Sequence, residues 1–197
     1  FAFLFDFVDG FLARLLNTES EIGRQLDSFS DFITSGVVPG FVMYKLLIKS
    51  GLSEKLIISN LLNLNFYFSP ISLVGFLITI ATAFRLSKFN LTKNEHKYFQ
   101  GLPAPANCCM IIGLPFMFDF LGEKYLNHNL LFTITIFSIY MLNSKMKLIS
   151  LKNINILIVL VLFCLITSLV VLTNFAILTV FIFMYILSSL TYFQFRN

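Results

Sequence analysis

The sequence predicts an all-α fold, a polytopic bundle of about seven transmembrane helices, from its composition and its long apolar runs. Of its 197 residues, 57% are hydrophobic and only 12% are charged, and the mean hydropathy is +0.85. Soluble domains have about 45–50% apolar and about 25% charged residues. A soluble enzyme, a disordered chain and a nucleic-acid-binding protein are therefore excluded, and no nucleic acid is expected as a partner.

A helix that crosses a bilayer needs about 20 mainly apolar residues, and seven runs approach or reach this length. The last two form an additional helix pair over 154–195, where no charged residue occurs between Ile154 and Tyr192. A shorter apolar segment, 56–64, is expected to form an interfacial helix. No linker divides the chain, so we expect a single domain over 1–197. The seven predicted spans are 1–16, 25–48, 70–87, 103–121, 129–144, 154–173 and 175–195.

The basic residues sort onto two sides when the spans alternate in direction. Placing the loop 17–24 in the cytoplasm puts ten Lys and Arg residues inside and four outside, as the positive-inside rule requires. The outside residues are Lys45, Lys49, Lys55 and Lys124, and the inside residues are Arg14, Arg24, Arg85, Lys88, Lys93, Lys97, Lys145, Lys147, Lys152 and Arg196.

Acidic residues gather at the start of the chain, since six of the ten lie within the first 31 residues. Asp6 and Asp9 stand in an otherwise apolar run. A carboxylate at the centre of a membrane helix costs about 2.5–3.5 kcal/mol on insertion scales, so such residues usually face a polar cavity and have a function there.

Helical spacing predicts which faces carry these acids. At 100° per residue, Asp6 and Asp9 share an arc with three further residues. In the next helix, Asp27 and Asp31 follow Gly23 at intervals of four and form one stripe. The two carboxylates of each helix converge if the helices pack side by side. The residues that share the first arc are Gly10, Ala13 and Arg14.

Four converging carboxylates would repel one another unless cations lie between them. Hard divalent ions that prefer oxygen ligands, Mg²⁺ or Mn²⁺, suit this donor set. The small residues Gly10, Ala13 and Gly23 leave room for a bulky ligand, and Arg14 supplies a guanidinium suited to phosphate. The pattern therefore predicts a metal-bound diphosphate at the membrane surface.

These residues form the pattern Asp-x2-Asp-Gly-x2-Ala-Arg-x8-Gly-x3-Asp-x3-Asp over 6–31, with every fixed position filled. The pattern resembles the signature of the CDP-alcohol phosphatidyltransferase family. Members of that family carry an additional helix upstream of the first aspartates. The start of this chain at Phe1, inside an apolar run, is therefore expected to reflect an N-terminal truncation.

Flanking residues resemble one branch of this family, the bacterial integral-membrane phosphatidylserine synthases (CDP-diacylglycerol–serine O-phosphatidyltransferases). The likeness covers 13–28, the segment 85–90 with its Arg-x2-Lys-Phe-Asn, and the Gly-Leu-Pro-Ala-Pro-Ala block at 101–106. Lys88 departs from the pattern, because the branch usually has Arg there, and 34–39 also differs.

The resemblance implies transfer of the phosphatidyl group of CDP-diacylglycerol to the hydroxyl of L-serine, giving phosphatidylserine and CMP. It implies that Asp6, Asp9 and Asp27 bind two Mg²⁺ or Mn²⁺ ions. Asp31 would be the general base on the serine hydroxyl and also touch a metal ion. The residues implied to hold the nucleotide and diphosphate are Gly10, Ala13, Arg14 and Gly23.

The acceptor site is less defined by the sequence. Serine carries a carboxylate, so a basic group at the cytoplasmic end of the third span is expected, and Arg85 with its neighbour Asn90 fits that place. The alternative is that Arg85 and Lys88 only anchor the helix end among lipid headgroups. We further expect contact with membrane lipids, a homodimer, and location in a bacterial inner membrane with the active site facing the cytoplasm.

Two alternative functions remain at this stage, and a third, a catalytically inactive scaffold, is disfavoured because no residue of the aspartate pattern is missing. The same chemistry could use glycerol phosphate or inositol phosphate as acceptor, since 85–97 holds four basic residues. A different class of protein, an ion transporter, would also place acids in membrane helices. Transporters usually bury such acids near the midplane on broken or repeated helices, whereas here they cluster toward one side.

Overall fold

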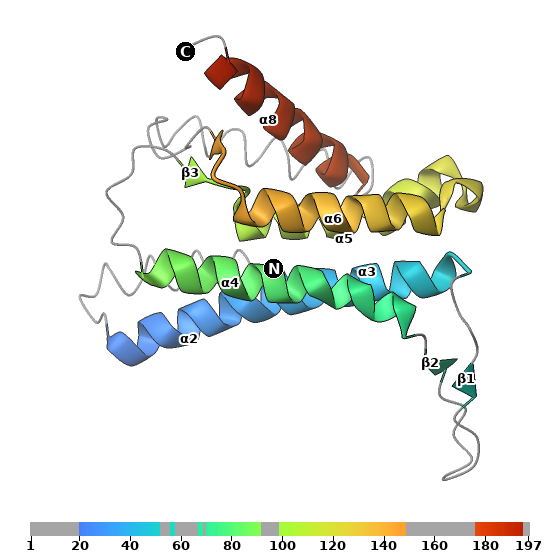
Figure 1. The fold of residues 1–197 in the computed structure, drawn as a ribbon, viewed down its shortest axis with the longest axis horizontal. Coiled ribbons are helices and arrows are strands. Elements are labelled where there is room, and N and C mark those ends of the chain that lie inside the picture. The colour runs from blue at the N-terminus through green and yellow to red at the C-terminus, as the bar shows by residue number, and fades with distance from the viewer. Residues whose placement is uncertain are drawn as a thin grey trace.

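The computed structural model describes residues 20–51, 56–57, 67–68, 70–91, 99–148 and 176–194, and these are mainly helical (Figure 1). The predicted helical bundle is confirmed, with helices at five of the seven expected places. The other two predicted spans, 1–16 and 154–173, lie outside the described residues. The elements are α2 (Glu21–Phe32), η1 (Ile33–Val37), α3 (Val38–Lys49), β1 (Leu56–Ile57), β2 (Tyr67–Phe68), η2 (Ile71–Phe76), α4 (Leu77–Leu91), β3 (Phe99–Gln100), α5 (Ala104–Leu121), η3 (Glu123–Tyr125), α6 (His128–Asn143), β4 (Lys147–Leu148) and α8 (Ala176–Gln194).

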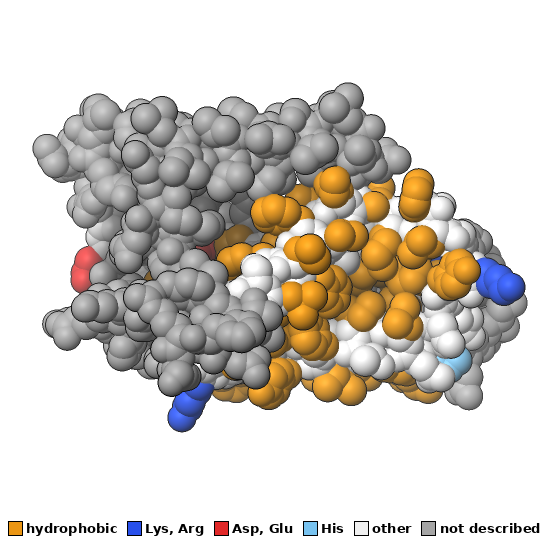
Figure 2. Space-filling view, turned by 90° about the horizontal axis from the view of Figure 1, so that it is seen from above, with side chains coloured by type: hydrophobic (Ala, Val, Ile, Leu, Met, Phe, Trp, Pro, Cys, Tyr) orange, Lys and Arg blue, Asp and Glu red, His pale blue; other side chains and the backbone are white. Residues whose placement is uncertain are grey.

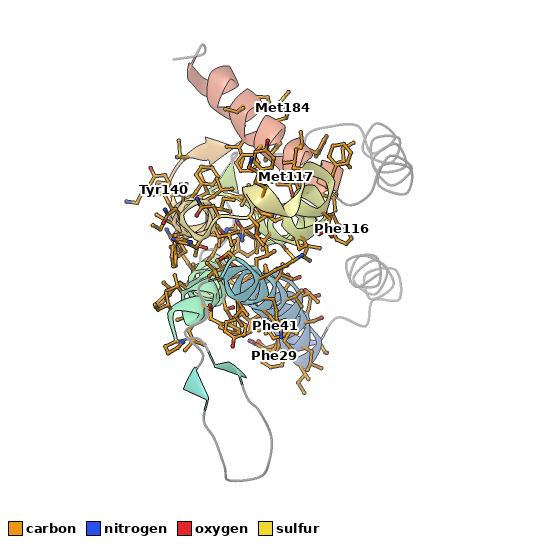
Figure 3. The ribbon with its side chains drawn as sticks, turned by 90° about the vertical axis from the view of Figure 1, so that its right-hand side faces the viewer. Phe29, Phe41, Phe116, Met117, Tyr140 and Met184 are labelled. Atoms are coloured by element: carbon orange, nitrogen blue, oxygen red, sulfur yellow. The ribbon has the colours of Figure 1, made fainter. Side chains whose placement is uncertain are left out.

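Three helices of the described part are long and apolar enough to cross a membrane. They are Glu21–Lys49, Ile71–Asn90 and Ala104–Leu121, and Ala176–Ser189 is a shorter apolar helix. Large apolar side chains point outward around the bundle, as Phe29, Phe41 and Tyr140 show in Figure 3. In Figure 2 apolar side chains cover the middle of the visible face, and the coloured charged side chains lie toward its ends. This arrangement suits a lipid-facing surface.

The first described helix is continuous from Glu21 to Lys49 but changes its winding. Ser20 begins it, because the Ser20 hydroxyl accepts a hydrogen bond of 3.0 Å from the Gly23 amide. The π-helical turn Ile33–Val37 ends two residues before Pro39, which lies in the first turn of α3. Proline lacks an N–H and clashes with the carbonyl four residues earlier, so a wider turn at this place relieves the clash.

Close helix contacts depend on small residues, as is common in membrane bundles. The Gly36 carbonyl accepts a 2.9 Å hydrogen bond from the Thr79 hydroxyl. A Cβ at Gly75 would lie 2.6 Å from the Tyr44 amide nitrogen, and a Cβ at Gly40 would collide with Thr79. The helix 21–49 and the unit formed by η2 and α4 are therefore packed backbone against backbone.

Two short antiparallel strand pairs lie outside the helices. Leu56 and Ile57 of β1 pair with Phe68 and Tyr67 of β2. The expectation of an interfacial helix over 56–64 is therefore wrong at its start, where the backbone is extended and paired across a hairpin. The pair β3–β4 joins the chain before α5 to the chain after α6.

Gly101 shows why the glycine of the 101–106 block is required. Its φ is +70°, and a Cβ there would lie 2.9–3.0 Å from the carbonyl oxygens of Leu142, Ser144 and Met141. Its amide donates to Met146, and the Leu102 amide donates to Met141. The block therefore fixes the start of α5 against the end of α6.

The helices alternate in direction, so one end of the bundle gathers the start of α2, the end of α4, the start of α5 and the end of α6 (Figure 1). We call this the acidic end, because Asp27 and Asp31 lie on α2 there. At the opposite end Lys49 forms a 3.7 Å salt bridge with Asp119. The described basic residues sort as the sequence predicts: Arg85, Lys88 and Lys145 toward the acidic end, and Lys45, Lys49 and Lys124 toward the other.

Changing Gly75 to Ala is expected to destabilise the bundle by about 1–3 kcal/mol, because the added methyl group would overlap the backbone of α3. A thiol-reactive dye can follow thermal unfolding in detergent through exposure of the buried Cys108. Leu73→Ala, on the same turn but 40% exposed, is the control. Equal melting temperatures for Gly75→Ala and the control would contradict this packing.

Candidate active site

The stripe of Gly23, Asp27 and Asp31 lies on one helix, as the sequence predicts. All three residues belong to α2, which the Ser20 cap begins, so their spacing of four places them on one face. Gly23 and Asp27 are exposed, whereas Asp31 is partly buried in the last turn of α2. The stripe therefore descends from solvent at the acidic end toward the interior.

The two carboxylates lack a positive partner in the described part of the chain. None of the Lys and Arg side chains that the structure describes forms a salt bridge with Asp27 or Asp31. Like charges four residues apart on a helix repel each other. This unbalanced pair is a suitable partial donor set for a hard divalent cation, which takes carboxylate oxygens as ligands.

The other half of the predicted site lies outside the described residues, so its convergence with α2 is untested. Within the described ranges, no three His, Cys, Asp or Glu side chains group closely enough to hold a metal ion. That result fits a site that takes only two of its four carboxylates from α2. The predicted site residues outside the description are Asp6, Asp9, Gly10, Ala13 and Arg14.

The structure brings the end of α4 to this face of α2. The Asn90 amide nitrogen donates a 3.3 Å hydrogen bond to the hydroxyl of Ser28, the residue after Asp27. Arg85 lies between one and two turns earlier on α4. Its Nε is buried and has no hydrogen-bond partner among the described residues. Of the two residues predicted for the acceptor site, Asn90 thus bonds to α2 beside Asp27, and Arg85 lies five residues earlier on α4.

Lys88 lies on a different side of α4. It lines a groove of about 470 Å³ between α4 and α6, together with Phe84 and Asn143. The remaining lining residues, Leu77, Ile80, Ala81 and Ile139, are apolar. Lys88 thus lies in an apolar groove on the outside of the bundle, whereas the side chain of Asn90 bonds to α2.

Sequence reasoning missed a set of polar residues inside the bundle. Asn107 is fully buried, and its Oδ1 accepts a 2.6 Å hydrogen bond from the Ser138 hydroxyl of α6. Ser35, one turn beyond Asp31, is also fully buried, and its hydroxyl has no hydrogen-bond partner in the part of the chain that the structure describes. Asn107 could have been noticed in the sequence as a polar amide within an apolar run, because polar groups inside membrane helices are often functional.

Comparisons with a family model and with known proteins agree on one family. A sequence model of CDP-alcohol phosphatidyltransferases matches residues 1–142. A protein of Bacillus subtilis named CDP-diacylglycerol–serine O-phosphatidyltransferase is 35% identical over 110 residues, which cover 54% of this chain and 52% of that protein.

Two further proteins carry the same name. The one from Methanocaldococcus jannaschii is 31% identical over 111 residues, covering 56% of this chain and 44% of its own length. The one from Saccharomyces cerevisiae is 27% identical over 121 residues, covering 57% and 37%. This chain thus spans about half or less of the length of these relatives.

The family match covers well over half of the chain and includes both halves of the aspartate pattern. It confirms the resemblance on which the site was predicted. The chain, an integral membrane protein with apolar helices, belongs to the CDP-alcohol phosphatidyltransferase family.

Proposed function

We propose that the protein transfers the phosphatidyl group of CDP-diacylglycerol to the hydroxyl of L-serine, giving phosphatidylserine and CMP. The observation that carries the proposal is the aspartate stripe of α2, which completes the family pattern and ends at the partly buried Asp31. The names of the relatives from three organisms support serine as the acceptor.

The donor set fits divalent metal ions. Asp27 lies on one helical face with Asp31, and the described part of the chain supplies neither with a basic partner. Asp6 and Asp9 would complete the ligand set for two Mg²⁺ or Mn²⁺ ions. When bound, these ions would neutralise the diphosphate and the charge that develops on the departing CMP.

The chain's own residues then divide the remaining work. Asp31 would take the proton of the serine hydroxyl. The serine oxygen would then form a bond to the phosphatidyl phosphorus while the bond between that phosphorus and CMP breaks. The small residues Gly10, Ala13 and Gly23 leave space for the nucleotide, and Arg14 would hold the diphosphate. Arg85 and Asn90, at the end of α4, would bind the acceptor.

The acidic end is proposed to face the cytoplasm of a bacterial cell at its inner membrane. The support is the basic residues, because Arg85, Lys88 and Lys145 lie toward that end and the cytoplasmic side of membrane proteins is usually the more basic. The homodimer expected from the sequence stays a prediction.

Acceptor choice is tested with purified protein, CDP-diacylglycerol, Mn²⁺ and either labelled L-serine, glycerol 3-phosphate or inositol phosphate. We expect CMP release and labelled lipid with serine alone. CMP release with glycerol 3-phosphate but not with serine would contradict the acceptor assignment. Ion flux into liposomes without CMP release would indicate a transporter instead.

Replacing Asp31 by Asn is expected to lower turnover about 10²- to 10⁴-fold, because the amide cannot accept the serine proton. Binding of CDP-diacylglycerol should be largely retained, which equilibrium binding in detergent measures beside CMP release. Asp119→Asn is the control, since Asp119 lies at the opposite end beside Lys49. An equal loss of binding and turnover would show that Asp31 acts chiefly as a metal ligand or a structural residue.

Removing divalent metal with a chelator is expected to abolish CMP release, and Mg²⁺ or Mn²⁺ should restore it. In the Asp27→Asn protein a higher metal concentration should be needed for half-maximal restoration, because one ligand has lost its charge. A metal titration of CMP release measures both effects. Full activity in the presence of the chelator would rule out the proposed ions.

A further inference from the structure

Three buried polar atoms have no hydrogen-bond partner among the described residues: Ser35 Oγ, Arg85 Nε and Asn107 Nδ2. Ser35 and Asn107 are fully buried. Leaving a buried donor unpaired is costly, so native proteins rarely do so without a reason. Three such atoms in one bundle call for a common explanation.

Hydrogen bonds between the helices place these atoms at a similar depth along the bundle. The α4 helix runs antiparallel to the helix 21–49, with Asn90 bonded to Ser28 and Thr79 bonded to the Gly36 carbonyl. Arg85 lies between these two contacts and is therefore level with the stretch between Asp31 and Ser35.

The start of α5 reaches the same level. The Cys108 thiol donates a 3.2 Å hydrogen bond to the Thr34 carbonyl, so the adjacent Asn107 lies beside the π-helical turn that contains Ser35. Figure 3 looks along the bundle and shows α4, α5, α6 and the helix 21–49 arranged around a shared interior.

Ser138 orients the Asn107 side chain. Its hydroxyl donates to Asn107 Oδ1 at 2.6 Å, so the amide oxygen is occupied and the amide N–H groups are left. We call Ser35, Arg85, Asn107 and Ser138 the buried polar layer. Its unpaired atoms are two obligatory donors, one of them cationic, and one hydroxyl. A ligand that matches them must offer acceptors, and a carboxylate does so.

The layer lies about 6 Å beyond Asp31 along the helix axis, because Ser35 is four residues further along the helix and each residue advances it by about 1.5 Å. We propose that Asn107, with Ser35 and Arg85, binds the carboxylate of L-serine while the serine hydroxyl lies at Asp31. This inference rests on the proposed function. It adds two helices, α5 and the π-helical turn, to an acceptor site that sequence analysis placed on α4 alone.

Asn107→Leu is expected to raise the KM for L-serine roughly tenfold or more, since one donor to a buried anion is lost. The KM for CDP-diacylglycerol should stay within about twofold. Ser35→Ala, a smaller change, should raise the serine KM in the same direction. The matched control is Thr135→Val, which removes another fully buried hydroxyl, one that bonds only to the Leu131 carbonyl of its own helix.

A second readout separates binding from structural damage. Serinol, which has a hydroxymethyl group in place of the carboxylate, should be a poor acceptor for the natural chain. Asn107→Leu should narrow the preference for serine over serinol, whereas a general loss of packing would lower both rates alike. If Asn107→Leu does not fold, the inference is tested with Ser35→Ala, through its KM for serine and its ratio of rates with serine and serinol.

An unchanged serine KM and serine-to-serinol ratio in the variants that fold would overturn the inference and leave the proposed function standing. If the natural chain releases no CMP with serine, the proposed function itself fails, and the assignment of the layer fails with it.

Discussion

Carboxylates beside a hydrocarbon core are the constraint on which this structure depends. Each costs free energy unless a cation or a polar cavity compensates it. The described chain gives Asp27 and Asp31 no basic partner, and both lie on one face of α2. The proposed divalent ions would provide that compensation and would at the same time attract a diphosphate. The same bound ions would therefore offset the free-energy cost of the carboxylates and hold the substrate for the proposed reaction.

The surrounding helices hold this face in position. Ser20 fixes where α2 begins, and Pro39 places a π-helical turn just beyond Asp31. The close approach at Gly36, Gly40 and Gly75 then aligns α4 with the same helix. Because the two helices are packed backbone against backbone, the Asn90 amide reaches Ser28, one residue from Asp27. Tight packing far from the acids thus sets the position of Asn90, which we propose for the acceptor site.

Much of this could be predicted from the sequence because it depends on period and composition. Apolar runs predicted the helices, and the spacing of Gly23, Asp27 and Asp31 predicted their common face. The helix extends a few residues before the span expected at 25–48, because Ser20, a favoured N-cap residue, begins it. Leu56 and Ile57 were assigned to a helix because apolar content does not distinguish a hairpin from an interfacial helix.

The interior of the site could not be predicted in the same way. A lone Asn107 in an apolar run has no periodic partner, and its pairing with Ser138 depends on how α5 and α6 dock. The π-helical turn changes the direction in which the Ser35 side chain points, and a hydropathy pattern does not predict such a turn. The roles proposed for Asp6 and Asp9 rest on the resemblance, whereas the buried polar layer follows from how the helices pack.

The central claim is that carboxylates from two adjoining helices hold divalent ions against the diphosphate of the donor lipid. Pulsed electron paramagnetic resonance of bound Mn²⁺ tests it directly in the protein with CDP-diacylglycerol. The account predicts hyperfine coupling between Mn²⁺ and the phosphorus nuclei of the lipid, and loss of that coupling in the Asp27→Asn protein. Bound Mn²⁺ without any phosphorus coupling, or coupling that is unchanged in Asp27→Asn, would contradict it.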